Sequence, residues 1–283
     1  MKIDKPALIK QGWLRAIVGL VVFYLVVDNS VYIPRLIMQL FGTSIDRLGS
    51  VTNSVIFMLL AVYLFRRFVD RQSFVSLGFA VRGFGRDVIL GLLGPLLLMG
   101  TGFLVLHFLG NIEITSFNPS FGMLLYWAIG LLFAAALEEV PLRGYMLNNM
   151  MQSMNKYIAV GIISVIFGLL HATGQNVNII GILNCTLLGL LVGLYYVRKR
   201  NIWVPLVFHT AWNFFQGTVF GFEVSGRPLD YNLITTEISG NELLTGGGFG
   251  LEGSLILTLL TVLMITVLEM REFKRRKIRM LKS

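Results

Sequence analysis

Charged side chains are scarce in this chain of 283 residues: they make up 14% of it, whereas a soluble domain carries about 25%. Histidine occurs three times and cysteine once. The single cysteine, Cys185, excludes an intramolecular disulfide, and because it lies in an apolar run we expect it to pack in the core. With 55% apolar residues, the chain has too little polar surface to cover itself in water. The composition therefore predicts an integral membrane protein.

The net charge of +9 first suggests nucleic-acid binding, since basic surfaces bind phosphate backbones. The positions of the basic residues argue against that class. Almost all of them lie in short segments between apolar runs, which is where a membrane protein carries them for orientation. We therefore expect the lipid bilayer as a partner and no nucleic acid; the sequence leaves the oligomeric state open.

Apolar runs long enough to cross a bilayer recur along the whole chain, since a span needs roughly 20 residues. They predict an all-α, polytopic transmembrane bundle of about eight helices that forms a single domain over residues 1–283. The predicted spans lie at about 13–40, 50–68, 87–109, 121–148, 157–173, 177–197, 202–222 and 252–270.

The basic residues also predict the orientation of this bundle. Eight helices place both termini on one side, and all of the 24 lysines and arginines except Arg35, Arg47 and Arg227 fall on that side. Because cytoplasmic loops carry the excess of basic residues, both termini are predicted to be cytoplasmic. The compact chain favours a multi-pass protein of the cytoplasmic membrane of a prokaryote.

Two adjacent carboxylates, Glu138 and Glu139, interrupt a strongly apolar run, followed by Arg143. Ionisable groups at membrane depth cost roughly 2.5 to 3.5 kcal/mol each, so they require partners or a function. Arg143 lies one helical turn after Glu139, and this spacing predicts an ion pair. An isolated ion pair of this kind requires no catalytic role, because it can simply hold helices together. Glu138 points about 100 degrees away and is left over, and a carboxylate that can exchange a proton is what a general base requires.

Histidines follow on two later spans. His171 ends an apolar run, and His209 precedes Asn213 by one helical turn. His107 lies among leucines, and we interpret it as structural or interfacial. Counted along their helices, Glu139, His171 and His209 fall in the inner to middle part of a core about 30 Å thick, so the three spans are able to bring them together.

These residues resemble the motifs of the CAAX protease and bacteriocin-processing family of intramembrane peptidases. This family includes CAAX prenyl endopeptidases and bacterial self-immunity proteins. The resemblance covers about 120–220, the predicted catalytic core, and the glycine-rich stretch 245–254 looks like one in bacterial members. Leu142 departs from the aromatic residue that members often carry before the arginine. The matching motifs are Glu138, Glu139 and Arg143; Phe167 and His171; and His209 and Asn213.

The resemblance implies hydrolysis of peptide bonds within the membrane. By the family's pattern, Glu138 would activate the attacking water with help from His171, and Arg143 would hold Glu139. His209 and Asn213 would stabilise the oxyanion, a role that requires preorganised donors in a dry cavity. Pro141 is expected to disturb the helix beside the carboxylates.

The sequence leaves the metal question open. No cofactor is required by the residues themselves, but Glu138, His171 and His209 are ligand types that suit zinc or another divalent ion, and family members are commonly named metalloproteases. The His-Glu-x-x-His signature of zinc proteases is absent. Catalysis by glutamate without a metal explains the same residues and is favoured.

Two other classes of protein compete with a peptidase. A transporter also buries Glu, Arg, His and Asn, but neither repeated halves nor paired broken helices are evident. A non-catalytic scaffold or immunity protein would bind its partner without cleaving it. For a peptidase, a peptide precursor, a bacteriocin leader or another membrane protein is favoured over a prenylated CAAX substrate. The depth of the motif residues suggests a site that opens toward the cytoplasm or sideways into lipid.

Overall fold

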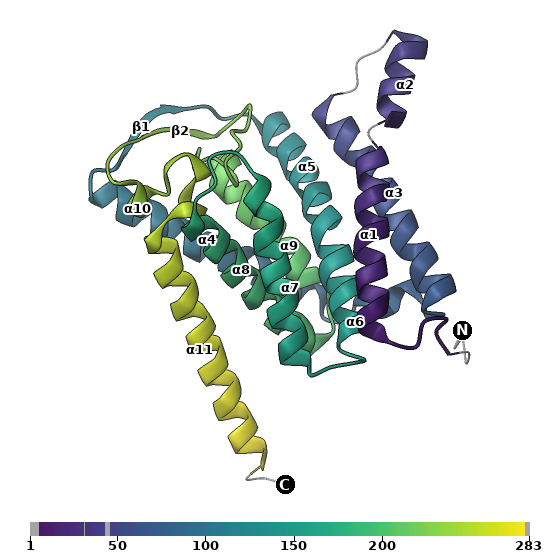
Figure 1. The fold of residues 1–283 in the computed structure, drawn as a ribbon. Helices are drawn as coiled ribbons and strands as arrows, with labels where there is room; N and C mark the ends of the chain where they lie inside the picture. Colours follow the sequence, from purple (N-terminus) through teal and green to yellow (C-terminus); the bar gives the residue numbers. More distant parts are fainter. Residues whose placement is uncertain (1–5, 31, 43–45, 281–283) are drawn as a thin grey trace.

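The chain folds into a bundle of helices that run side by side (Figure 1). The structure, a computed structural model, describes residues 6–30, 32–42 and 46–280. In chain order, with short π- and 3₁₀-helical turns labelled η, the elements are α1 Gly12–Ser30, α2 Tyr32–Phe41, α3 Arg47–Leu64, η1 Phe65–Val69, η2 Phe74–Leu77, α4 Phe84–Phe108, β1 Ile112–Phe117, α5 Phe121–Glu139, η3 Val140–Leu147, α6 Asn148–Met150, α7 Lys156–Leu170, η4 His171–Thr173, α8 Ile179–Lys199, α9 Trp203–Asn213, η5 Phe214–Val219, β2 Ile234–Ile238, α10 Glu242–Thr245, η6 Gly247–Phe249, η7 Leu251–Gly253 and α11 Leu255–Met280.

Six helical segments within the described ranges are long and apolar enough to cross a membrane, and all six coincide with predicted spans. They are Gly12–Leu40, Arg47–Val69, Phe84–Phe108, Phe121–Met150, Lys156–Thr173 and Ile179–Lys199. The other two predicted spans are helical but different in kind. Helix α9 is short and continues into η5, and α11 carries charged residues from Glu269 onward. Six apolar spans make this a multi-pass helical membrane protein, and the total of eight remains a prediction.

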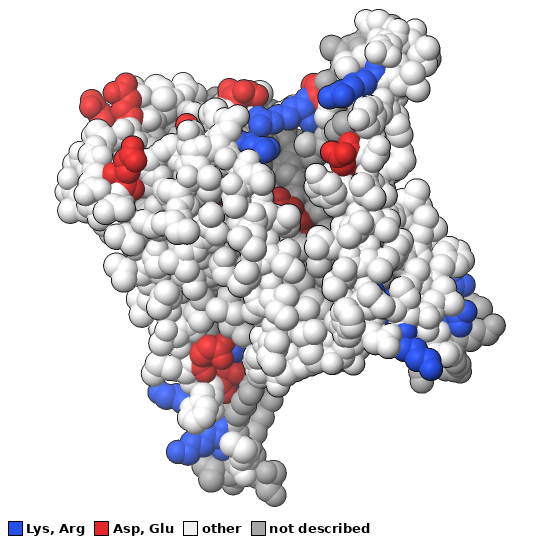
Figure 2. Space-filling view, in the orientation of Figure 1, with Lys and Arg blue, Asp and Glu red and all other residues white. Residues whose placement is uncertain are grey.

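The surface of the bundle suits a bilayer. Its outward side chains include many exposed leucine, isoleucine, valine and phenylalanine residues. Figure 2 shows charged side chains gathered at the two ends of the molecule and an almost uncharged band between them. Both chain ends lie toward one end of the bundle (Figure 1). An apolar band between charged ends is the distribution that a spanning protein requires.

A small two-stranded sheet, which the sequence analysis did not predict, lies on the helical bundle at the end opposite the termini. Strands β1 and β2 pair antiparallel, with Ile112 opposite Ile238 and Glu113 opposite Glu237. They join the connection before α5 to the connection after η5. The sequence analysis missed them because β1 lies in a short link and β2 in a long loop, both outside the apolar runs. The sheet ties together two connections next to the motif-bearing helices.

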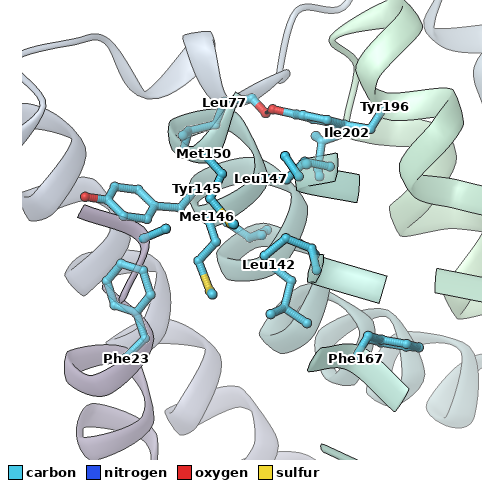
Figure 3. Close-up of a cluster of buried hydrophobic side chains, with 14 of the residues drawn as sticks. Phe23, Leu77, Leu142, Tyr145, Met146, Leu147, Met150, Phe167, Tyr196 and Ile202 are labelled. Atoms are coloured by element: carbon cyan, nitrogen blue, oxygen red, sulfur yellow. Dashed lines mark hydrogen bonds between the residues drawn. The ribbon is translucent and has the colours of Figure 1, made fainter. Parts of the chain in front are cut away.

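The helix that carries the adjacent glutamates changes form at Pro141. Proline has no N–H to donate to the carbonyl one turn earlier, so the α-helix α5 ends at Glu139 and continues as the π-helix η3. All eight residues of η3 are buried. In Figure 3, Leu142, Met146 and Leu147 of η3 lie between Phe23 of α1 on one side and Phe167 of α7 on the other. The helix that bears the site is therefore packed firmly on both sides.

A buried carboxylate organises the end of the bundle near the termini. Asp70 accepts hydrogen bonds from Arg66 at 2.7 Å, Asn149 at 3.0 Å and Tyr145 at 3.1 Å. Arg15 of α1 lies 3.6 Å from the same carboxylate. Since these partners belong to α1, η1, η3 and α6, Asp70 joins the N-terminal helices to the segment that follows the glutamates.

Candidate active site

Glu139 is the centre of a buried hydrogen-bonded group. Its Oε1 accepts from Arg143 Nη1 at 2.9 Å and from His209 Nδ1 at 3.0 Å. The side chain is 1% exposed and Arg143 is 0% exposed. The ion pair expected from the spacing of Glu139 and Arg143 is thus present, and His209 joins it from α9. The carboxylate oxygen accepts from His209, so the Nδ1 of this ring carries a proton.

Arg143 also links the first motif to the second. Its guanidinium lies 4.2 Å from the centre of the Phe167 ring, a cation–π contact. Phe167 in turn packs edge-on against His209, with ring centres 5.8 Å apart. Arg143 Nε and Nη2 have no hydrogen-bond partner among the described residues. The aromatic ring therefore shares the stabilisation of the buried cation with Glu139.

His171 lies at the end of α7, where the helix gives way to η4. Its Nδ1 donates to the backbone carbonyl of Phe167 at 2.8 Å. A carbonyl only accepts, so this bond fixes the tautomer and leaves Nε2 with a free lone pair when the ring is neutral. The Phe167 ring lies 4.7 Å from the His171 ring, which restricts its rotation. His171 is thereby oriented to accept a proton at Nε2.

Glu138 differs from its neighbour in having no such fixed partner. Its Oε2 is shielded from solvent and has no hydrogen-bond partner among the residues that the structure describes. The side chain lines the same cavity as His209. Of the two adjacent glutamates, one is thus held by Arg143 and His209 and the other is left over, as the sequence predicts.

A cavity of about 540 Å³ brings all the motif residues together. Glu138, Glu139, Arg143, Phe167, His171, His209 and Asn213 all line it. They come from α5, η3, α7, η4 and α9, so the three motifs meet although 75 residues separate the first from the last. Asn213 lies one turn after His209 and is 9% exposed. Three separate helical segments therefore contribute polar groups to one cavity.

The mouth of this cavity lies away from the termini. Its lining includes Arg47 at the start of α3, Tyr126 near the start of α5 and Arg227 in the connection after η5. Figure 2 shows the corresponding hollow opening toward the end of the molecule that carries the sheet. Tyr24 of α1 and Leu170 of α7 also line the cavity and are 64% and 48% exposed, so the cavity borders the lipid-facing surface as well.

This arrangement agrees with one of the two openings suggested by the sequence, and it conflicts with the other if the termini have their predicted orientation. A sideways opening into lipid agrees with the exposed α1 and α7 residues. A cytoplasmic opening disagrees with the predicted cytoplasmic termini, because the mouth faces the other side. The reason is that η3 and α6, which are buried throughout, close the end near the termini. Depth counted along the helices does not reveal which end is closed.

The ligands predicted for a metal ion do not converge. The described part of the chain contains no group of three or more His, Cys, Asp or Glu side chains placed to hold a metal ion. Glu138, His171 and His209 all face the cavity, and the bonds at Nδ1 leave Nε2 of both histidines free, as in a metal-bound histidine, but the three side chains do not form such a group. As they lie, these residues do not fit a zinc site, and the chemistry below is written for the side chains themselves.

Glu252 is a buried residue of the site that the sequence analysis did not single out. Its carboxylate accepts from Trp212 Nε1 at 2.8 Å and from the backbone N and Oγ of Ser225, each at 2.8 Å. The side chain is 4% exposed and lines the cavity. It lies within the glycine-rich stretch 245–254, and a lone carboxylate among glycines just before the last apolar run was the available signal. Glu252 fixes the loop at the mouth to α9.

The fold and site define a class: a multi-pass helical membrane protein with a buried Glu, Arg, His and Asn site in an internal cavity. Comparison with known families agrees with this class. A family model described as type II CAAX prenyl endopeptidase Rce1-like matches residues 118–215, which confirms the resemblance over a region that holds all six predicted site residues. At the level of the family, this match indicates a membrane peptidase. A search of curated proteins found no match.

Proposed function

We propose that the protein is an intramembrane endopeptidase that hydrolyses a peptide bond in its internal cavity. The observation that supports the proposal is that two adjacent carboxylates differ in their hydrogen-bond partners. Glu139 is held by Arg143 and His209, whereas Glu138 Oε2 has no partner among the described residues and lies in the same cavity as His171. An ion pair that only held helices together would not need the second carboxylate.

The proposed reaction begins at Glu138. Its carboxylate takes a proton from a water molecule, and the resulting hydroxide attacks the carbonyl carbon of the scissile peptide bond. The carbon–nitrogen bond then breaks, and the proton passes to the leaving amine. His171 Nε2 assists by holding the water or carrying the proton, since its Nδ1 is already fixed by the Phe167 carbonyl. One water is consumed, and one carboxylate and one amine are formed.

The oxyanion of the intermediate requires donors that are already in place. Asn213 supplies an amide N–H, and His209 supplies a second donor at Nε2 when its ring is protonated. Glu139 stabilises the protonated ring through its bond to Nδ1, and Arg143 keeps this carboxylate oriented. Each such donor contributes roughly 3 to 4 kcal/mol to transition-state stabilisation. Glu139 and Arg143 thus act through His209 and are positioning residues.

The substrate is proposed to be a peptide segment of a precursor, a bacteriocin leader or another membrane protein, with a prenylated CAAX protein as a further alternative. The cavity is compatible with each of these peptide substrates, because apolar side chains of α1, α3, α5 and α8 line most of its wall and can contact an apolar peptide segment. A role in bacteriocin immunity would depend on the same cleavage. A scaffold or immunity protein that acts only by binding would keep its biological effect without Glu138.

The proposed function is tested by hydrolysis in ¹⁸O-labelled water. Purified wild-type protein in detergent is expected to cleave members of a peptide library and to place one ¹⁸O atom in the new carboxylate, as detected by mass spectrometry. Cleavage is expected to persist in a strong chelator, because the site residues do not converge on a metal position. Activity lost to the chelator and restored by zinc would overturn the metal-free mechanism. Solute flux through proteoliposomes without any cleavage would favour a transporter.

Replacing His171 by Gln is expected to lower kcat by about 10² to 10⁴, the range for loss of an acid–base group, with little change in KM. His171 is not among the fully buried residues, so the variant should fold and melt like the wild type. His107→Gln is the matched control. Its Nδ1 also contacts a backbone carbonyl, that of Ile112 at 3.3 Å, but His107 does not line the cavity. Equal activity loss in both variants would contradict the role given to His171.

A further inference from the structure

Positive charge gathers at the mouth of the cavity. Only three basic residues, Arg35, Arg47 and Arg227, are predicted on the side away from the termini, and two of them line the cavity. Figure 2 shows lysine and arginine side chains along the edge of the hollow, with acidic atoms inside it. The deeper wall carries carboxylates, including Glu138 and Glu252. Among the charged residues that line the cavity, those at the rim are thus basic, and the deeper ones are acidic apart from Arg143, which is paired with Glu139.

Both rim arginines are available to a ligand. The Arg47 side chain is 46% exposed, and its carboxylate partner Asp230, at 3.8 Å, is 82% exposed. An ion pair so open to water is weak and easily displaced. The guanidinium of Arg47 also lies 5.4 Å from the centre of the Trp127 ring, which orients it at the rim. Arg227 is exposed and lines the same cavity.

The loop that carries Arg227 is anchored to the cavity wall. Backbone hydrogen bonds of 2.9 and 3.0 Å join Val224 and Arg227 in both directions. Between them, Ser225 is held by two hydrogen bonds to Glu252. Glu252 is fixed in turn by Trp212 of α9, the helix that carries His209 and Asn213. These hydrogen bonds thus fix the position of Arg227 relative to the proposed catalytic residues of α9.

We propose, on the basis of the peptidase function above, that Arg47 and Arg227 select peptide substrates that carry a carboxylate at the mouth of the cavity. Guanidinium groups bind carboxylates through paired, charge-assisted hydrogen bonds. The interior carboxylates repel such a group, so the acidic part of the substrate stays at the rim while the scissile bond reaches Glu138. The carboxylate is either an Asp or Glu side chain or the free C-terminus of the peptide. On the predicted orientation, this substrate approaches from the non-cytoplasmic side.

Binding and cleavage are measured separately to test this selection. The Glu138→Gln protein is titrated with a fluorescent peptide that carries an acidic residue, with its Asn or Gln counterpart, and with versions that have a C-terminal carboxylate or carboxamide. Each arginine is expected to strengthen binding of the preferred carboxylate about fivefold to tenfold. Arg47→Gln and Arg227→Gln should each lose that factor, and Arg227→Glu should favour a lysine-bearing peptide. In the active protein, the same changes should raise KM and leave kcat unaltered.

Arg35→Gln serves as the control, since Arg35 is exposed on the same side but does not line the cavity. If the double variant Arg47→Gln, Arg227→Gln binds acidic and amide peptides with the same ratio as the Glu138→Gln parent, the proposed selection is wrong. Because binding is read in a protein that does not cleave, this result is distinct from failure of the peptidase function. Selective binding with no cleavage by wild type would reject hydrolysis and retain the carboxylate site.

Discussion

Replacement of Glu138 by Gln is expected to reduce peptide cleavage by a factor of at least about 10² to 10⁴. Glutamine has nearly the same shape but cannot take a proton from water. The Oε2 of Glu138 has no hydrogen-bond partner among the described residues, so the substitution removes no bond that holds the fold. The free energy of unfolding should therefore change little. The measurement is the initial rate of cleavage of a library-derived peptide, together with thermal unfolding in the same detergent.

Two further substitutions make the result specific. Glu139→Gln is expected to lower both activity and stability, because it leaves buried Arg143 without its carboxylate. Glu113→Gln is the surface control: Glu113 is exposed on β1 and lies opposite Glu237, so removing its charge relieves a repulsion. If Glu138→Gln retained wild-type rates while Glu139→Gln lost them, the roles of the two carboxylates would have to be exchanged.

The sequence predicts much of the fold because hydropathy and charge act on long segments. Six helical segments that are long and apolar enough to cross a membrane are found where apolar runs were predicted. Helix α9 and its continuation η5 show the limit of this method: they are short and contain His209, Asn213 and Gln216, because they pack inside the bundle. Strands β1 and β2 were missed because their pairing joins residues more than 110 positions apart.

The candidate site could be predicted in part, because the residues within each motif are four positions apart and therefore lie on one face of a helix. The Glu139 and Arg143 pair follows from that spacing, and its presence is confirmed by the 2.9 Å contact. The bond from His209 to Glu139 does not follow from spacing, since it depends on how α9 crosses α5. Glu252 was missed for a similar reason: its partners Trp212 and Ser225 are distant in sequence. The proposed catalytic roles remain predictions.

Asp70→Asn is expected to lower the stability of the protein by about 3 to 5 kcal/mol, the usual effect of removing one partner from a buried ion pair. Arg15 and Arg66 are 2% and 1% exposed and would remain buried without a carboxylate to neutralise them. Asparagine keeps one oxygen that can accept from Tyr145, but its amide nitrogen cannot accept from Arg66 and Asn149 as Oδ2 does. The effect therefore combines the lost charge with lost acceptors. The melting temperature in detergent, followed by tryptophan fluorescence, should fall by roughly 10 °C.

Asp46→Asn is the matched control for this charge, because asparagine caps a helix as well as aspartate does. Asp46 is exposed and accepts from the backbone N of Gly49 at 2.8 Å, so the same substitution should leave the melting temperature almost unchanged. Asp70 lies at the end of the bundle that η3 and α6 close, whereas the cavity opens at the other end. Below its melting temperature, Asp70→Asn should therefore cleave peptides at the wild-type rate. A normal melting temperature in Asp70→Asn would mean that water or another residue neutralises the two arginines, and that this end of the bundle is held by apolar packing around Tyr145 instead.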